Sequence, residues 1–111
     1  MNTVVLELQD IAIQDVETTD DSLFVDLRDG RTITVPLAWY PRLLHGTAEE
    51  RRHWRLIGQG AGIHWPELDE DLSIEGLILG RPSSESVQPL QRWLKSREVK
   101  RANGNNHLDE Q

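Results

Sequence analysis

The stretch Ser22–Leu37, SLFVDLRDGRTITVPL, holds two runs of alternating apolar residues on either side of a turn signal. The apolar positions are Leu23, Val25 and Leu27 before the turn, and Ile33, Val35 and Leu37 after it. Successive side chains of a strand point to opposite faces, so each run predicts a strand with one face toward a core. The stretch therefore predicts an antiparallel hairpin.

The length of the turn sets the register of this hairpin. A two-residue Asp29–Gly30 loop would place Val25 opposite Thr34, which would send the two apolar rows to different faces. A three-residue Arg28–Gly30 loop, with its glycine in the left-handed conformation, places Val25 opposite Ile33. The apolar pattern therefore favours the three-residue loop.

The rest of the chain predicts short elements around this hairpin. Before the hairpin, residues 4–13 predict one bulged strand or two short strands. After it, the chain predicts a short helix from Pro41 to Gly46 and a second from the Thr47–Glu50 capping box to about Trp54. A second hairpin over residues 56–63 and a helix from Ser73 to Gly80 complete the set. We expect a small single α+β domain of antiparallel meander and hairpins over residues 1–81. An amphipathic C-terminal tail helix over 82–101 and a disordered end over 102–111 should follow.

Composition excludes several classes of protein. The chain has 111 residues, enough for one modest core, and its hydrophobic fraction of 37% is typical of a globular domain. It has no cysteine, which excludes disulfides, zinc–thiolate sites and thiol catalysis. No apolar run approaches the roughly 18 residues of a membrane span, and no signal peptide is evident, so we expect a cytoplasmic protein without membrane contact.

Charge is distributed unevenly along the chain. Residues 1–81 hold 15 acidic residues against 7 arginines, whereas residues 82–101 hold five basic residues against two acidic ones. An acidic body attracts basic partners and repels phosphate backbones. Nucleic-acid contact is therefore expected only through the tail, residues 82–101.

The segment Ile63–Leu77, IHWPELDEDLSIEGL, contains a histidine followed by several carboxylates. His64, Glu67, Asp69 and Asp71 are candidate ligands for a divalent metal, and His64 with Asp69–Asp71 would suit a metal-assisted hydrolase. The alternative is a solvated acidic turn that leads into the helix capped by Ser73, where negative charge is favourable. The structural alternative is favoured, and we expect no cofactor.

Two further features have both a binding and a structural interpretation. Gly58, Gly60 and Gly62 resemble a phosphate loop, but they do not open a helix, so a hairpin turn is favoured. The aromatic residues Trp39, Tyr40, Trp54 and Trp65 could form a ligand cage, but a domain this small needs them for its core.

The tail helix has an apolar side and basic residues around it. Its apolar residues are Leu90, Trp93 and Leu94, and its basic residues are Arg92, Lys95, Arg97 and Lys100. Docking onto the sheet of its own domain is the simplest expectation. A groove on a partner protein and a nucleic acid are the alternatives.

Several motifs together resemble the bacterial family known as domain of unknown function 2442. They are Asp29-Gly30-Arg31, Val35-Pro36-Leu37, Trp39-Tyr40-Pro41-Arg42-Leu43, Glu49-Glu50-Arg51, Ile57-Gly58, Gly62-Ile63-His64-Trp65-Pro66 and Asp69-Glu70-Asp71-Leu72-Ser73. The resemblance covers about residues 11–97. It implies a compact α+β fold and a gene beside that of a second small protein, in pairs suspected to be toxin–antitoxin-like, and it identifies no catalytic residue.

These observations favour a non-enzymatic, antitoxin-like or accessory protein that binds a partner by protein–protein contact. The expected partner is a small basic protein encoded nearby, recognised by the acidic body. Candidate contact residues are Trp39, Arg42, His64, Trp65, Asp69, Glu70, Leu90, Trp93 and Leu94. The alternatives are the metal-assisted hydrolase and weak nucleic-acid binding through the basic tail.

Overall fold

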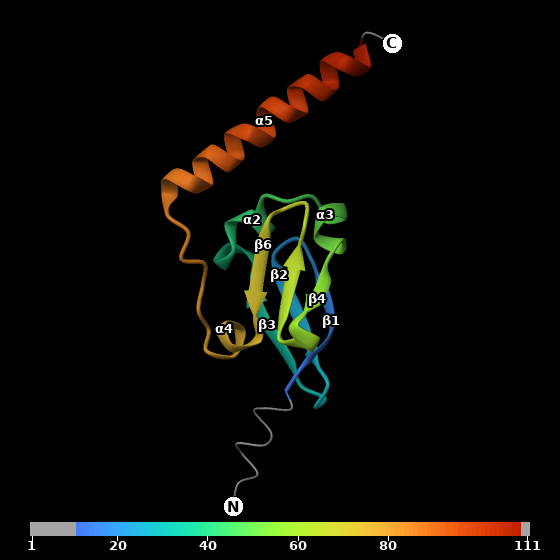
Figure 1. The fold of residues 1–111 in the computed structure, drawn as a ribbon, viewed down its shortest axis with the longest axis vertical. Helices are drawn as coiled ribbons and strands as arrows, with labels where there is room; N and C mark the ends of the chain where they lie inside the picture. Colours follow the sequence, from blue (N-terminus) through green and yellow to red (C-terminus); the bar gives the residue numbers. More distant parts are fainter. Residues whose placement is uncertain (1–10, 110–111) are drawn as a thin grey trace, which may run out of the picture.

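The computed structural model describes residues 11–109 and contains two three-stranded antiparallel sheets (Figure 1). Sheet A consists of β1 (Ile13–Thr18), β2 (Ser22–Leu27) and β3 (Thr32–Pro36), and sheet B consists of β4 (Arg55–Ile57), β5 (Gly62–Trp65) and β6 (Glu70–Ser73), each in chain order. The helices are η1 (Leu37–Trp39), α2 (Pro41–Leu44), α3 (Ala48–Arg52), η2 (Gly58–Gly60), α4 (Ile74–Ile78) and α5 (Val87–Asp109). The predicted small α+β fold is confirmed.

The β2–β3 hairpin has the predicted three-residue loop. Val25 lies opposite Ile33, and the amide of Leu27 donates to the carbonyl of Arg31 at 2.8 Å. Gly30 has φ +97°, the left-handed conformation that this loop requires. The apolar pattern of the two strands therefore sets their register.

Strand β1 completes sheet A with a bulge. Its pairing with β2 shifts between Ile13 and Asp15, so one extra residue is accommodated there. The predicted strand residues 4–10 lie outside the described part of the chain.

A solvated acidic turn was expected over residues 66–71, and the structure corrects the end of this turn at the segment Glu70–Ser73. It forms β6, an edge strand that pairs with β5, with Asp71 opposite His64 and Leu72 opposite Ile63. The strand has four residues, of which only Leu72 is apolar, so no apolar alternation marks it in the sequence.

The two sheets pack face to face and share one core with the short helices. Its buried side chains are Ile13, Val16, Leu23, Val25, Leu27, Val35, Leu37, Tyr40, Leu43, Ile63, Trp65, Leu68 and Leu77. Trp39 and Trp54 pack against this cluster from its rim. The aromatic residues thus serve mainly as core, as the structural interpretation predicted.

Buried polar contacts join α2 to α3. Arg51 is only 6% exposed, and its Nη1 donates to the carbonyls of Leu43 and Gly46 at 3.1 and 2.6 Å. Its own carbonyl accepts a hydrogen bond from the indole of Trp65 at 3.1 Å. Arg51 therefore ties the end of α2 to the core.

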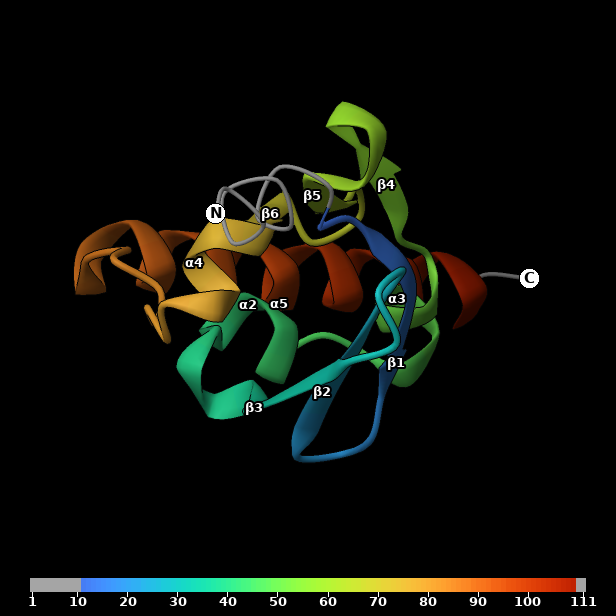
Figure 2. The same cartoon turned by 90° about the horizontal axis from the view of Figure 1, so that it is seen from below.

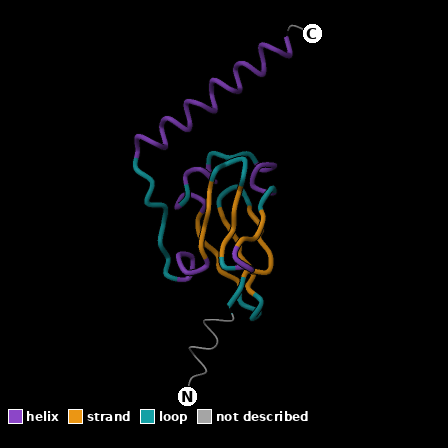
Figure 3. The backbone as a smooth tube through the Cα atoms, viewed as in Figure 1, coloured by secondary structure: helices purple, strands orange, loops and turns teal. Residues whose placement is uncertain are grey.

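Helix α5 follows an extended segment, residues 81–86, that runs along the side of the domain (Figure 3). The helix then crosses the end of the domain at which α2 and α3 lie (Figures 1 and 2). It begins at Val87 and continues to Asp109, so it extends through most of the residues 102–111 for which the sequence predicts disorder. It docks on the helical end of its own domain rather than on a sheet.

Candidate partner-binding surfaces

The predicted acidic cluster is divided between separate contacts. On the outer face of sheet B, Nδ1 of His64 contacts a carboxylate oxygen of Asp71 on the neighbouring strand. Glu67 instead contacts Nδ1 of His53, at the end of α3. Asp69 adopts φ +50° and turns toward Arg42, with Nη1 to Oδ2 at 3.4 Å.

This division bears on the metal hypothesis. The structure does not bring His64, Glu67 and Asp69 together. Across the described residues, no group of three or more histidine and carboxylate side chains is placed to hold a metal ion. The acidic residues of this segment act instead as individual hydrogen-bond and ion-pair partners.

A cleft of about 500 Å³ separates β6 and α4 from the extended segment 81–86. Tyr40 closes one end, and its hydroxyl donates to the carbonyl of Arg81 at 3.3 Å. Glu70 lines the cleft and forms no ion pair among the described residues, and burial raises its pKa. The cleft therefore collects carboxylates around Arg42.

Arg42 holds the extended segment and α5 at the same time. Its guanidinium forms a two-point ion pair with Glu85, at 2.6 Å between Nη2 and Oε2 and 3.0 Å between Nε and Oε1. The same guanidinium lies 5.0 Å from the centroid of the Trp93 ring, within cation–π distance. Glu85 is the main reason that the pKa of Arg42 is raised.

A second arginine completes this arrangement from α5. Arg97 lies 4.8 Å from the Trp93 centroid and donates to both carboxylate oxygens of Glu50 on α3. The hydrogen bonds from Arg97 are the main reason that the pKa of Glu50 falls to about 2. We call these five residues, Glu85, Arg42, Trp93, Arg97 and Glu50, the α5 clamp.

Several of the predicted contact residues are thus engaged within the chain. Trp65 has no exposed surface, so its assignment as a partner contact is corrected: its indole fills the core. Leu90, Trp93 and Leu94 lie half-buried on the same side of α5. Trp39 is half-buried at the core rim, where its carbonyl accepts from the amide of Ser83 at 2.9 Å.

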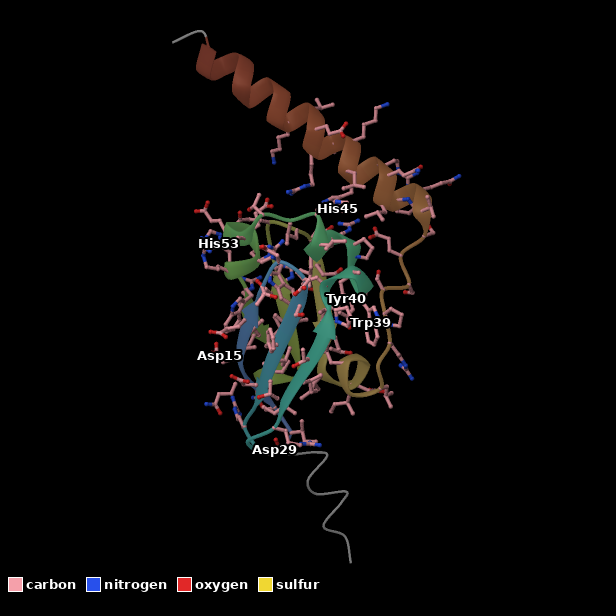
Figure 4. The ribbon with its side chains drawn as sticks, turned by 180° about the vertical axis from the view of Figure 1, so that it is seen from behind. Asp15, Asp29, Trp39, Tyr40, His45 and His53 are labelled. Atoms are coloured by element: carbon pink, nitrogen blue, oxygen red, sulfur yellow. The ribbon has the colours of Figure 1, made fainter. Side chains whose placement is uncertain are left out.

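The open face of sheet A presents a different set of residues. Figure 4 looks onto this face, which no described helix covers, and Figure 2 shows the same face at the lower edge. Phe24 lies on it, half-buried, because the flanking Leu23 and Val25 point into the core. The only phenylalanine of the chain is therefore outside the core cluster.

Carboxylates surround Phe24 on this face. Glu17 lies directly opposite Phe24, and Asp15 lies directly opposite Asp26 in the next exposed row. All three carboxylates are exposed, and in the described part of the chain none of them forms an ion pair. Like charges that face each other across strands are destabilising. We call Asp15, Glu17, Phe24 and Asp26 the sheet A patch.

None of the residues of this patch was among the predicted site residues. The signal is present in the sequence, because the alternation that places Leu23, Val25 and Leu27 inward also places Phe24 and Asp26 outward. The histidine and clustered carboxylates of residues 63–77 are the more conspicuous pattern.

Together these features define a small α+β domain of two packed antiparallel sheets with a clamped C-terminal helix. Residues 13–83 match the model of the family described as Protein of unknown function (DUF2442), and the chain belongs to that family. The resemblance drawn from the motifs is confirmed. Helix α5, which begins at Val87, lies beyond the matched region.

Solved structures share the fold. A protein of unknown function from Rhodospirillum rubrum is 27% identical with a TM-score of 0.59, over 68% of this chain and 93% of that one. An uncharacterized protein from Chromobacterium violaceum is 21% identical with a TM-score of 0.61, over 75% of this chain and 78% of that one. No match was found among curated proteins. Within residues 11–109, no helix has the length and hydropathy needed to cross a bilayer.

Proposed function

We propose that this chain is a non-enzymatic protein that binds a basic protein partner through the sheet A patch. The observation that carries the proposal is the position of Phe24, an aromatic side chain outside the core and among three carboxylates that have no ion-pair partner in the described residues. Asp26 accepts a hydrogen bond from the hydroxyl of Thr32 at 2.7 Å, but the like charges of Asp15 and Asp26, which face each other across the strands, disfavour folding.

The patch has the composition of a protein-binding surface. Aromatic side chains near the centre of an interface supply much of its binding energy, and a polar rim shields them from water. Here Phe24 is the anchor and Asp15, Glu17 and Asp26 form the rim. Acidic rim residues attract a basic partner and increase its rate of association.

The charge of the body supports a basic partner. Residues 1–81 carry 15 acidic residues against 7 arginines, so the potential around the body is negative. The small protein encoded beside genes of this family is the first partner to test, and an antitoxin-like or accessory role would follow from such a complex.

The experiment compares two charge-matched variants in a calorimetric titration with the purified neighbouring protein. One variant carries Asp15→Asn, Glu17→Gln and Asp26→Asn on the patch. The control carries Glu49→Gln, Glu75→Gln and Glu98→Gln, three exposed carboxylates elsewhere that form no ion pair in the described residues. The proposal predicts that binding weakens at least tenfold in the patch variant and is retained in the control.

A second pair of variants tests the anchor. Phe24→Ala should abolish measurable binding, whereas Leu79→Ala, which shortens another exposed apolar side chain, should not. Equal losses in the patch and control variants would contradict the proposal. The proposal would also be contradicted if the neighbouring protein is basic and does not bind the wild-type chain.

A further inference from the structure

The side of α5 that faces away from the clamp is cationic. At 100° per residue, Gln88, Arg92, Lys95, Ser96 and Val99 lie on this side, and Lys100 lies at its border, about 60° around the helix from Arg97. Arg92, Lys95, Ser96, Val99 and Lys100 together line one shallow hollow on the helix. All except Val99 are polar, and all are exposed. We call Arg92, Lys95 and Lys100 the α5 cations.

The clamp leaves these cations available. Arg97 is occupied by Glu50 and Arg42 by Glu85, whereas the α5 cations form no ion pair among the described residues. Glu98, the one acidic residue between positions 87 and 100, lies roughly 120° around the helix from Arg92 and roughly 60° from Lys95, so it offsets at most one of the three cations. The exposed side of α5 therefore keeps a net positive charge.

The acidic body does not cancel this charge at physiological salt. Glu50 of the body and Glu85 of the extended segment, the two carboxylates of the clamp, are already paired with arginines. Salt screens the interaction of exposed charges that lie more than about 8 Å apart at 0.15 M.

We propose that the α5 cations form a docking surface for the phosphate backbone of nucleic acid. The cations lie within residues 92–100 of α5, about 12 Å of helix, a span over which they can meet neighbouring phosphates. The apolar side of α5 is held by the clamp, so the helix has no free apolar side to insert into a bilayer. Charge complementarity without apolar contact fits a phosphate backbone best.

Fluorescence anisotropy of a labelled 20-base-pair DNA duplex tests this inference with the full chain. The test variant carries Arg92→Gln, Lys95→Gln and Lys100→Gln. The charge-matched control carries Arg52→Gln, Arg55→Gln and Arg81→Gln, three exposed cations of the body. Circular dichroism and thermal melting of each variant confirm that α5 and the domain are intact.

The expected result is binding by the wild type and by the control, with a loss of tenfold or more in the test variant. Three phosphate contacts predict that affinity falls about 40-fold between 50 and 200 mM salt. No binding at 50 mM salt, or equal losses in both variants, would overturn the inference. Tighter binding to vesicles containing anionic lipid than to the duplex would also overturn it. Because the sheet A patch is intact in the test variant, these outcomes are independent of the proposed function.

Discussion

Arg97 and Glu50, 47 residues apart in the sequence, form a two-point ion pair that holds α5 to the domain. The two donor–acceptor distances are 3.0 and 2.7 Å, and both side chains are less than one fifth exposed. The same arginine lies against Trp93, whose other neighbour is Arg42. Arg97 is thus coupled to α3 through Glu50, and to α2 through Trp93 and Arg42.

Removal of this ion pair should release α5 without unfolding the sheets. We expect Arg97→Ala to weaken docking of the helix by about 0.5–2 kcal/mol, because the pair is two-point and largely shielded. Hydrogen exchange at residues 87–100 should quicken, while exchange in β2 and β5 stays slow. Lys95→Ala, on the opposite side of α5, is the control, and an equal effect there would contradict the role of the clamp.

Acid should weaken the clamp within a defined range. Folding lowers the pKa of Glu50 from 4.5 to about 2, mainly through hydrogen bonds from Arg97. A carboxyl group whose pKa is lowered by folding stabilises the fold above its unfolded pKa, and this contribution is lost as the pH falls through the folded value. The contribution should therefore decline between about pH 4.5 and pH 2.

Thermal melting of wild type and Glu50→Gln as a function of pH measures this contribution. The wild type should be the more stable protein at pH 7, and the two melting temperatures should converge as the pH approaches 2. A difference that stays constant over the whole range would show that the charge of Glu50 is not responsible.

Two glycines with left-handed backbones should respond differently to alanine. Gly30→Ala, where a Cβ would meet nothing within 4 Å, should cost about 1–2 kcal/mol of backbone strain alone. Gly60→Ala would place a Cβ 3.0 Å from the Cβ of Ala12 and 3.1 Å from the carbonyl oxygen of Ile13, which adds about 1–3 kcal/mol. Denaturant unfolding of both variants should show this order, and equal losses would refute the close approach.

Neutralising one member of the opposed carboxylate pair should stabilise the protein. Asp15→Asn removes the repulsion from Asp26 across the strands, so the free energy of unfolding should rise by a few tenths to about 1 kcal/mol. Glu75→Gln is the control, because Glu75 lies in the first turn of α4, where charge is favourable. A loss of stability in Asp15→Asn would mean that the aspartate is retained for folding rather than for binding.

Local rules predicted much of the fold. The alternation of Leu23, Val25 and Leu27 set the register of the hairpin, and the Thr47–Glu50 capping box and the Ser73 cap began the predicted helices. These elements depend on interactions between residues that are close in the sequence, so a pattern of a few residues is enough to predict each of them. Strand β6 was missed because it is four residues long and depends on pairing with β5.

The contacts of the candidate surfaces were less predictable, because they join distant parts of the chain. No spacing rule links Arg42 to Glu85 or Arg97 to Glu50, and the acidic residues near His64 were separated by strand pairing and turn geometry. The sheet A patch differs from these contacts, because strand alternation alone is enough to place Phe24 and Asp26 on one outward face.

The most direct test of the proposed function is an NMR titration of the isotopically labelled full chain with the purified product of the neighbouring gene, which the proposal expects to be a small basic protein. The largest shift changes should occur at Asp15, Glu17, Phe24 and Asp26, with little change around His64, in the cleft beside Glu70, or on α5. Changes centred on any of those three regions, or no change at saturating partner, would contradict binding through the sheet A patch.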